Sequence, residues 1–295
     1  MIHETIPLTV PGADGPAELT AYVPGSFPEL GEHRLRSAVI ICPGGGYHCL
    51  SDREGEPVAL RFAGLGFAAF LLRYHAAPRG RWPVPQRQLL AAVDHVRSNW
   101  ERYHVDPHGV VVMGFSAGGH LAGSAGLLWN KRELYQPLRR RPSAFRPDGV
   151  VLCYPVVTSG PAAHRGSIEH LLGERYDELL ELVSLEKQVP RQAPPFFIWH
   201  TADDVTVPVE NALLLDKALR AKGVPSELHI YPSGGHGQSL ADRTVFAPGE
   251  DWRVSAPCAV WVEHCAAWLH RNFGDYAVAP HPDEREKREK KKRGR

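Results

Sequence analysis

The segment "GFSAGGH", residues 114–120, places one serine between two glycines, directly after the apolar run "GVVVM". In a G-x-S-x-G sequence a strand turns sharply into a helix, and the serine at the bend exposes its hydroxyl. Gly114 and Gly118 leave room where β-carbons would clash. The next amide, on Ala117, faces the same space from a helix N-terminus, which favours an anion. The pattern predicts a nucleophile at Ser116, and a chance match in a small-residue turn is the alternative.

A second glycine turn, "CPGGGYH" at residues 42–48, follows an earlier apolar run. Three consecutive glycines leave backbone N–H groups unshielded, so the loop can aim two donors at a developing oxyanion. A phosphate-binding loop would carry Lys and Ser or Thr after its last glycine. Tyr47 and His48 stand there instead. The sequence therefore favours an oxyanion role over a phosphate loop or a plain β-turn.

A nucleophilic serine needs a base, and the base needs an orienting acid. His236 lies in the glycine-rich segment "PSGGHGQSL", directly after the last strand-like segment, where an imidazole can face a site. His120 is closer in sequence to Ser116, but it lies one helical turn below it. We therefore interpret His120 as structural, or as a residue that supports the catalytic ones without contacting substrate. Asp203 and Asp204 in "HTADDVTVP" are the candidate acids.

Short, nearly continuous apolar runs alternate with amphipathic segments along the chain, which is typical of a parallel sheet covered by helices on both faces. The first residues hold two β-like pieces that could pair as antiparallel edge strands. Because open α/β sheets place their sites at the carboxyl ends of the strands, the candidate residues should meet there. We expect strands within 6–10, 18–23, 36–42, 67–75, 109–115, 148–157, 194–202 and 226–234, and helices within 56–66, 83–105, 116–129, 208–223 and 257–273.

One domain is expected over residues 1–275, because no internal repeat or linker divides it. Residues 156–194 interrupt the alternation with two short helical patterns, and such an excursion often covers a site as a small cap. The end of the chain, 276–295, is expected to be a charged, disordered tail, since 282–295 carry no apolar residue. Eight basic residues there are diluted by four acidic ones, which disfavours a nucleic-acid role.

Composition narrows the functional classes further. The net charge of +1 gives no reason to expect nucleic acid or a membrane surface as the main partner. The longest uncharged apolar stretch, residues 62–72, is too short to span a bilayer, and the first residues lack the pattern of a signal peptide. Five cysteines, at spacings that match no zinc or redox motif, indicate buried free thiols. These features favour a reducing cytoplasm.

At four blocks the chain resembles the α/β-hydrolases, and within them the acetylesterase or acetylxylan-esterase-like group of BD-FAE type. The resemblance runs from about residue 37 to 273 and is strongest at 42–59, 105–122, 199–212 and 234–241. The four blocks together are far more specific than any one of them. They imply an α/β-hydrolase fold with a mostly parallel central sheet and helices on both faces.

The resemblance also implies site residues and a reaction. In that family pattern the acid stands four residues before a proline, here Asp204 before Pro208, so the implied triad is Ser116, Asp204 and His236. An oxyanion hole from Gly45, Gly46 and Ala117 is implied, with no cofactor and no metal. The implied substrates are small-molecule or oligosaccharide esters of short acyl groups, often O-acetyl groups on sugars such as xylo-oligosaccharides.

Some residues and alternatives remain open. Tyr47 is a candidate for contacting substrate in the acyl pocket, with packing as the alternative. Arg53, Glu54 and Glu56 are interpreted as a charge cluster at a helix N-terminus in preference to substrate contacts. A serine exopeptidase of the prolyl-oligopeptidase type and a non-catalytic binding protein on the same scaffold are the competing functions.

Overall fold

The computed structural model describes residues 1–27, 29, 34–249, 254, 256–274 and 277–278. Most of the predicted charged tail at 276–295, including all of 282–295, lies outside these residues.

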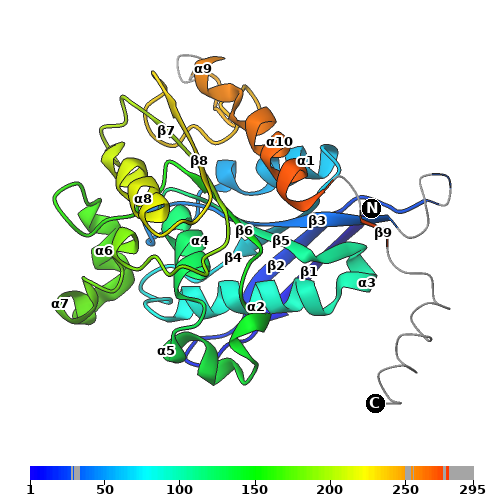
Figure 1. Cartoon of the computed structure of the whole chain (residues 1–295), viewed down its shortest axis with the longest axis horizontal. Coiled ribbons are helices and arrows are strands. Elements are labelled where there is room, and N and C mark those ends of the chain that lie inside the picture. Colours follow the sequence, from blue (N-terminus) through cyan, green and yellow to red (C-terminus); the bar gives the residue numbers. More distant parts are fainter. Residues whose placement is uncertain (28, 30–33, 250–253, 255, 275–276, 279–295) are drawn as a thin grey trace.

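A mixed sheet forms the centre of the molecule, with the strand order β1-β2-β4-β3-β5-β6-β7-β8 (Figure 1). β2 is antiparallel to both β1 and β4, whereas the neighbours from β4 to β8 run parallel. A short β9 pairs with the start of β3. The strands are β1 (Ile2–Leu8), β2 (Ala17–Val23), β3 (Arg34–Cys42), β4 (Ala68–Arg73), β5 (Val105–Phe115), β6 (Gly149–Cys153), β7 (Phe196–Thr201), β8 (Ser226–Tyr231) and β9 (Ala277–Val278).

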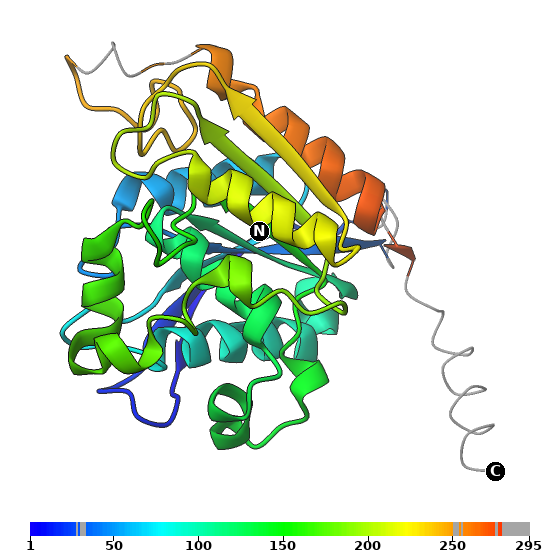
Figure 2. The ribbon, with the colours of Figure 1, turned by 60° about the vertical axis from the view of Figure 1, so that its left-hand side comes forward.

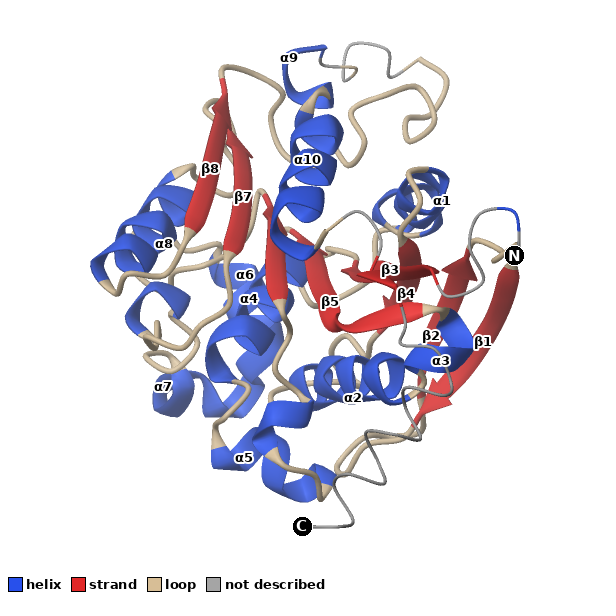
Figure 3. Ribbon diagram, turned by 45° about the vertical axis from the view of Figure 1, so that its right-hand side comes forward, coloured by secondary structure: helices blue, strands red, loops and turns tan. Residues whose placement is uncertain are grey.

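Helices cover both faces of this sheet (Figure 3). α1 and α10 lie on one face, and α2, α4 and α8 lie on the other. Figure 2 shows β7 and β8 between α8 and α10. The α-helices are α1 (Glu56–Gly64), α2 (Val84–Ser98), α3 (Trp100–Tyr103), α4 (Ala117–Leu128), α5 (Arg132–Tyr135), α6 (Arg165–Leu172), α7 (Tyr176–Leu179), α8 (Glu210–Ala221), α9 (Ala256–Ala259) and α10 (Trp261–Phe273). The 3₁₀ helices are η2 (Asp52–Glu54), η3 (Gln136–Leu138), η4 (Pro142–Ala144), η5 (Gly173–Arg175) and η6 (Leu185–Lys187).

The apolar runs of the parallel strands inside the sheet are buried on both faces, which explains why they are continuous rather than alternating. The edge strand β8 is mostly half-buried. The five residues of β6 and the last seven of β5 are all buried. Their side chains feed two hydrophobic cores, one under α2, α4 and α8 and one under α1 and α10. This arrangement confirms the predicted α/β-hydrolase architecture, and the pairing of β1 with β2 confirms the expected antiparallel edge.

Two predicted helices are divided. The expected helix at 83–105 ends at Ser98, and a separate short helix α3 follows. The closing helix at 257–273 is broken into α9 and α10, with Val260 as the N-cap of α10. No proline or glycine lies within 258–273 to mark this second break in the sequence. Within 156–194 the structure places α6 and α7 with η5 and η6, in agreement with the two short helical patterns expected there.

Candidate active site

Ser116 stands at the bend between β5 and α4, and its backbone has a φ of 53°. A non-glycine residue in this left-handed region is strained. A β-carbon on Gly114 would overlap the carbonyl oxygen of Gly118, and one on Gly118 would overlap the carbonyl oxygen of Cys42. Both glycines are therefore required by the close passage of backbone around the serine.

His236 connects this serine to an acid. Its Nε2 lies 2.8 Å from Oγ of Ser116, and its Nδ1 lies 2.6 Å from Oδ2 of Asp204. Ser116 comes from the β5–α4 bend, Asp204 from the loop after β7, and His236 from the loop after β8. The structure thus brings together the three residues that the sequence singled out, at the carboxyl ends of the parallel strands β5, β7 and β8.

Asp204 is surrounded by donors. Its Oδ1 accepts the amides of Thr206 and Val207, each at 2.9 Å. Its Oδ2 faces His236 and also Nε2 of His200, at 3.2 Å. Burial raises the pKa of the Asp204 carboxyl, but the hydrogen bonds from His200, His236 and Val207 outweigh burial and hold the pKa well below its usual range. Asp204 therefore remains an anion that can orient an imidazole and stabilise an imidazolium.

The neighbouring Asp203 is turned toward the histidine loop. Its two carboxylate oxygens accept the amides of Gly234 at 3.2 Å and Gly235 at 2.8 Å. These amides belong to the segment that carries His236, not to the turn that carries Asp203. The adjacent acids thus have different partners: Asp204 contacts the imidazole, and Asp203 contacts the backbone that holds it.

The glycine loop presents amides beside the serine hydroxyl. Gly45 and Gly46 have φ values of 120° and 62°, and both line the cavity that contains Ser116. The carbonyl oxygen of Gly45 accepts hydrogen bonds from the amides of His48 and Cys49. These two hydrogen bonds hold the peptide group between Gly45 and Gly46 in one orientation. Within the described part of the chain, the N–H groups of Gly45, Gly46 and Ala117 have no protein acceptor. These donors are free to bind an oxyanion.

Tyr47 requires a correction. Its side chain is 0% exposed and is absent from the lining of the cavity, so it does not offer a surface to substrate. Its hydroxyl donates instead to Nδ1 of His120, 2.9 Å away, while Nε2 of His120 donates to the Val183 carbonyl at 2.8 Å. Packing, the alternative for Tyr47, is what the structure shows, because a φ of 59° turns its side chain under the loop. His120 is likewise structural, as expected.

Glu54 lies directly before the N-terminus of α1, as interpreted from the sequence, and it also lines the cavity that contains Ser116. It is 3% exposed, and its Oε2 accepts the amide of Gly44 at 2.8 Å. Its Oε1 accepts the hydroxyl of Tyr154 at 2.7 Å, and that hydroxyl accepts the amide of Ser239 at 2.8 Å. The ring of Tyr154 packs edge-on against His236, with centroids 5.0 Å apart. Glu54 and Tyr154 therefore join the glycine loop to the histidine loop.

The cavity above Ser116 has a volume of about 360 Å³. Segment 156–194 contributes His164, whose Nδ1 lies 2.8 Å from Oγ of Ser167, and burial and the nearby His236 lower the pKa of His164. From the same segment, Nδ1 of His170 lies 3.0 Å from the Gly46 carbonyl. The cavity is lined by Gly45, Gly46, Cys49, Ser51, Arg53, Glu54, Ser116, His164, Thr206, His236 and Gly237.

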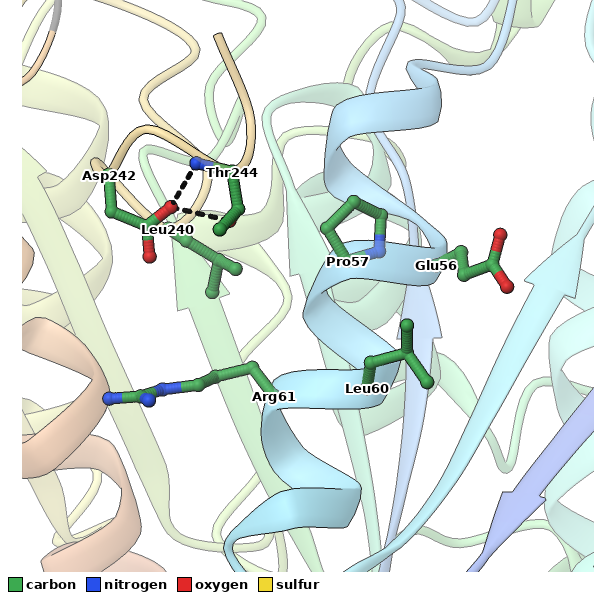
Figure 4. Close-up of a pocket in the computed structure, with 7 residues that line it drawn as sticks. All are labelled: Glu56, Pro57, Leu60, Arg61, Leu240, Asp242 and Thr244. Carbon is green, nitrogen blue, oxygen red and sulfur yellow. Dashed lines mark hydrogen bonds between the residues drawn. The ribbon is translucent and has the colours of Figure 1, made fainter.

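A separate hollow of about 500 Å³ lies between α1 and the loop at 240–244 (Figure 4). Pro57 and Leu60 on α1 and Leu240 on the loop make much of its surface apolar, and none of its lining residues belongs to the cavity above Ser116. The described residues contain no cluster of His, Cys, Asp and Glu that could hold a metal ion. Nor do they include a helix of the length and apolarity needed to cross a bilayer.

Four residues near the site were not singled out by the sequence: Tyr154, His164, His200 and Ser239. Tyr154 and Ser239 adopt positive φ values of 38° and 50°, which no local sequence pattern marks. His200 does lie in the recognised block 199–212, four residues before Asp204, and that spacing is the one available signal.

The fold and the serine at a strand-to-helix bend define the chain as an α/β-hydrolase. The chain belongs to the BD-FAE family, whose pattern matches residues 27–219. It is 38% identical over 231 residues to endo-1,4-beta-xylanase B of Butyrivibrio fibrisolvens, covering 77% of this chain and 36% of that protein. It is 31% identical to an acetylxylan esterase of Xylanibacter ruminicola, over 76% of this chain and 44% of that protein. The chain thus spans less than half the length of these two relatives.

Solved structures agree with this assignment. An acetyl ester-xyloside bifunctional hydrolase of Caldicellulosiruptor lactoaceticus matches with a TM-score of 0.76 and 35% identity, covering 91% of this chain and 96% of that one. A carboxylesterase of Lactobacillus plantarum matches with a TM-score of 0.80 and 26% identity, covering 95% and 100%. Both names describe ester hydrolysis.

Proposed function

We propose that this protein is a serine carboxylic ester hydrolase that removes short acyl groups, acetyl above all, from sugars or xylo-oligosaccharides. The observation that carries the proposal is a chain of two hydrogen bonds, from Ser116 Oγ to His236 Nε2 at 2.8 Å and from His236 Nδ1 to Asp204 Oδ2 at 2.6 Å. Backbone amides without an acceptor among the described residues lie beside the serine hydroxyl. The names of the relatives, an acetylxylan esterase and an acetyl ester-xyloside hydrolase, support the acyl group and the sugar.

In the proposed reaction, Oγ of Ser116 attacks the ester carbonyl carbon while Nε2 of His236 takes the hydroxyl proton. The negative charge that develops on the carbonyl oxygen is stabilised by the amides of Gly45, Gly46 and Ala117. Asp204 holds the imidazole in the correct tautomer and stabilises the imidazolium.

The tetrahedral intermediate then collapses. His236 gives its proton to the oxygen of the leaving alcohol, and the acyl group stays on Ser116 as an ester. A water molecule, deprotonated by His236, attacks this acyl-enzyme, and the carboxylic acid leaves as Ser116 regains its proton. The reaction needs no cofactor, because the chain supplies nucleophile, base and oxyanion donors.

The deciding experiment compares 4-nitrophenyl acetate, an acetylated xylo-oligosaccharide and an aminoacyl-proline 4-nitroanilide. An ester hydrolase cleaves the first two and leaves the anilide intact. Cleavage of the anilide alone would indicate the competing exopeptidase, and binding without turnover of any of the three would indicate a non-catalytic protein.

We also propose a reducing compartment, the cytoplasm. All five cysteines are free, and Cys49 among them is exposed beside the catalytic cavity. An oxidising compartment would expose that thiol to modification. Fractionation of the native host, with the enzyme detected by antibody, tests this location.

A further inference from the structure

Arg53 lies at the boundary between the catalytic cavity and an adjoining cavity of about 570 Å³, and it lines both. It belongs to η2, between the glycine loop and α1. A β-carbon placed on Gly237 would lie 3.3 Å from Nη2 of Arg53, so the guanidinium group rests against the residue that follows His236. The adjoining cavity is lined by Asp52, Arg53, Glu56, Pro57, Arg73, Thr244, Val245 and Phe246.

The charge of Arg53 is not matched by a neighbouring acid. Asp52 forms an ion pair with Arg73 at 3.0 Å, and both oxygens of Glu54 are occupied by the Gly44 amide and the Tyr154 hydroxyl. Across residues 1–27 and 34–249, no ion pair links the guanidinium group of Arg53 to a carboxylate. Its Nε is buried and has no hydrogen-bond partner. A buried donor without a partner costs free energy. Nη1 and Nη2 of the same guanidinium group are not buried in this way, and no described residue accepts a hydrogen bond from them, so they can bind a ligand.

The proposed chemistry fixes which half of the ester lies near this group. His236 must protonate the oxygen of the leaving alcohol, so that oxygen lies beside the imidazole. The oxyanion amides of Gly45, Gly46 and Ala117 hold the carbonyl oxygen instead. Because Arg53 rests against Gly237, its guanidinium group faces the alcohol half.

We propose that Arg53 binds a carboxylate on the alcohol half of the ester, so that the preferred substrates are acetylated acidic sugars, such as a uronic acid or a xylose chain that carries one. This inference rests on the proposed ester hydrolase function. A guanidinium group presents two parallel N–H donors that match a carboxylate, which a hydroxyl of a neutral sugar cannot do. The adjoining cavity gives room for further sugar units beyond the one that carries the acetyl group.

The test uses two esters that differ only in charge: mono-O-acetylated methyl glucuronoside with a free carboxylate, and the same compound as its neutral carboxamide. The wild type should show a kcat/KM at least about tenfold higher for the carboxylate. The ratio of kcat/KM for the carboxylate to kcat/KM for the carboxamide should fall to about one in Arg53→Met. In Arg53→Lys the ratio should be intermediate, because lysine keeps the positive charge but lacks the two parallel N–H donors of a guanidinium group. Arg61→Met is the matched control, since Arg61 lies on α1 and pairs with Glu263 at 3.1 Å. Its ratio should equal that of the wild type.

A second measurement needs no variant. Raising the salt concentration to about 0.5 M should reduce the wild-type ratio, because salt screens a charge pair at the mouth of a cavity. A wild-type ratio near one, or a ratio unchanged in a folded Arg53→Met protein, would overturn the inference while leaving the ester hydrolase function intact. Failure of the wild type to hydrolyse either ester or 4-nitrophenyl acetate would overturn the proposed function and the inference together.

Discussion

Oδ1 of Asp203 accepts a 2.8 Å hydrogen bond from the amide of Gly235, the residue directly before His236. Its neighbour Asp204 contacts the imidazole of His236 itself, at 2.6 Å. Two adjacent acids therefore act on one histidine, one through the backbone of its loop and one through its ring.

This division predicts unequal losses. Asp204→Asn should lower kcat on the order of 10⁴-fold, because the amide stabilises the wrong imidazole tautomer and leaves the imidazolium unpartnered. Asp203→Asn should cost about tenfold, since one oxygen can still accept an amide of the loop. Both are measured with 4-nitrophenyl acetate at one pH, with circular dichroism to check folding. A dead Asp203 variant beside an active Asp204 variant would reverse the assignment of the two acids.

Replacement of the nucleophile gives the second prediction. Ser116→Ala should lower kcat by about 10⁴ to 10⁶, because only binding and the oxyanion donors remain. Ser124→Ala is the matched control on the same helix, where the hydroxyl donates to the His120 carbonyl at 2.8 Å. That control should keep its turnover. If a purified, folded Ser116→Ala protein kept most of its activity, Ser116 would not be the nucleophile.

The third prediction concerns the bridge between the two catalytic loops. Glu54→Gln should lower kcat by about tenfold or more, with a smaller effect on KM, because the new amide group cannot accept from both Gly44 and Tyr154. Tyr154→Phe should have a similar effect. If the pair acts as one unit, the double variant loses less than the two single losses combined. Additive losses, or an equal rise in KM, would indicate separate structural roles.

How far the sequence predicts this site depends on how local each residue's requirement is. The bend at Ser116 can be recognised in the sequence because the backbone passes so closely there that only glycine fits two residues away on either side. Glu54 and Tyr154 are 100 residues apart, and their hydrogen bond forms only after β6 is placed beside β5. No pattern around Glu54 distinguishes it from the charged neighbours Arg53 and Glu56.

The same limit explains Tyr47 and the strands. Tyr47 follows the glycines proposed to bind the oxyanion. The sequence alone could not distinguish a residue in the pocket wall from one turned beneath the loop by its positive φ. The strands were predictable because burial on both faces leaves continuous apolar runs. The ends of helices were harder to predict: α2 ends at Ser98, and no glycine or proline marks that end in the sequence.

The fourth prediction concerns the acyl chain. A cavity of about 360 Å³ that must hold an acyl group together with the start of the alcohol leaves little room for a long chain. The kcat/KM for 4-nitrophenyl acetate should exceed that for butyrate, and laurate should be a poor substrate by about 100-fold or more. An optimum at laurate would point to a lipase-like acyl tunnel and would exclude acetyl specificity.

The last prediction is a dependence of stability on pH that originates at His120. Burial lowers the pKa of this imidazole from 6.5 to about 4, although its hydrogen bond to the Val183 carbonyl opposes the shift. Nδ1 of His120 already accepts a hydrogen bond from the Tyr47 hydroxyl. Protonation of Nδ1 would therefore place its N–H group against the O–H group of Tyr47, so that two donors would face each other. In the unfolded chain the same group takes up a proton near its ordinary pKa.

The sign follows from proton binding. Between the two pKa values the unfolded chain binds more protons than the folded protein, so the stabilisation is complete above about pH 6.5 and decreases as the pH falls toward 4. At about pH 5 the free energy of unfolding should be lower by about 2 kcal/mol from this one group. Urea unfolding at about pH 7.5 and about pH 5 measures the difference. In His120→Gln the difference in unfolding free energy between the two pH values should be smaller by about that amount. In His108→Gln, which changes an exposed residue, the difference should be the same as in the wild type. An identical pH dependence in wild type and His120→Gln would show that His120 is not the group responsible.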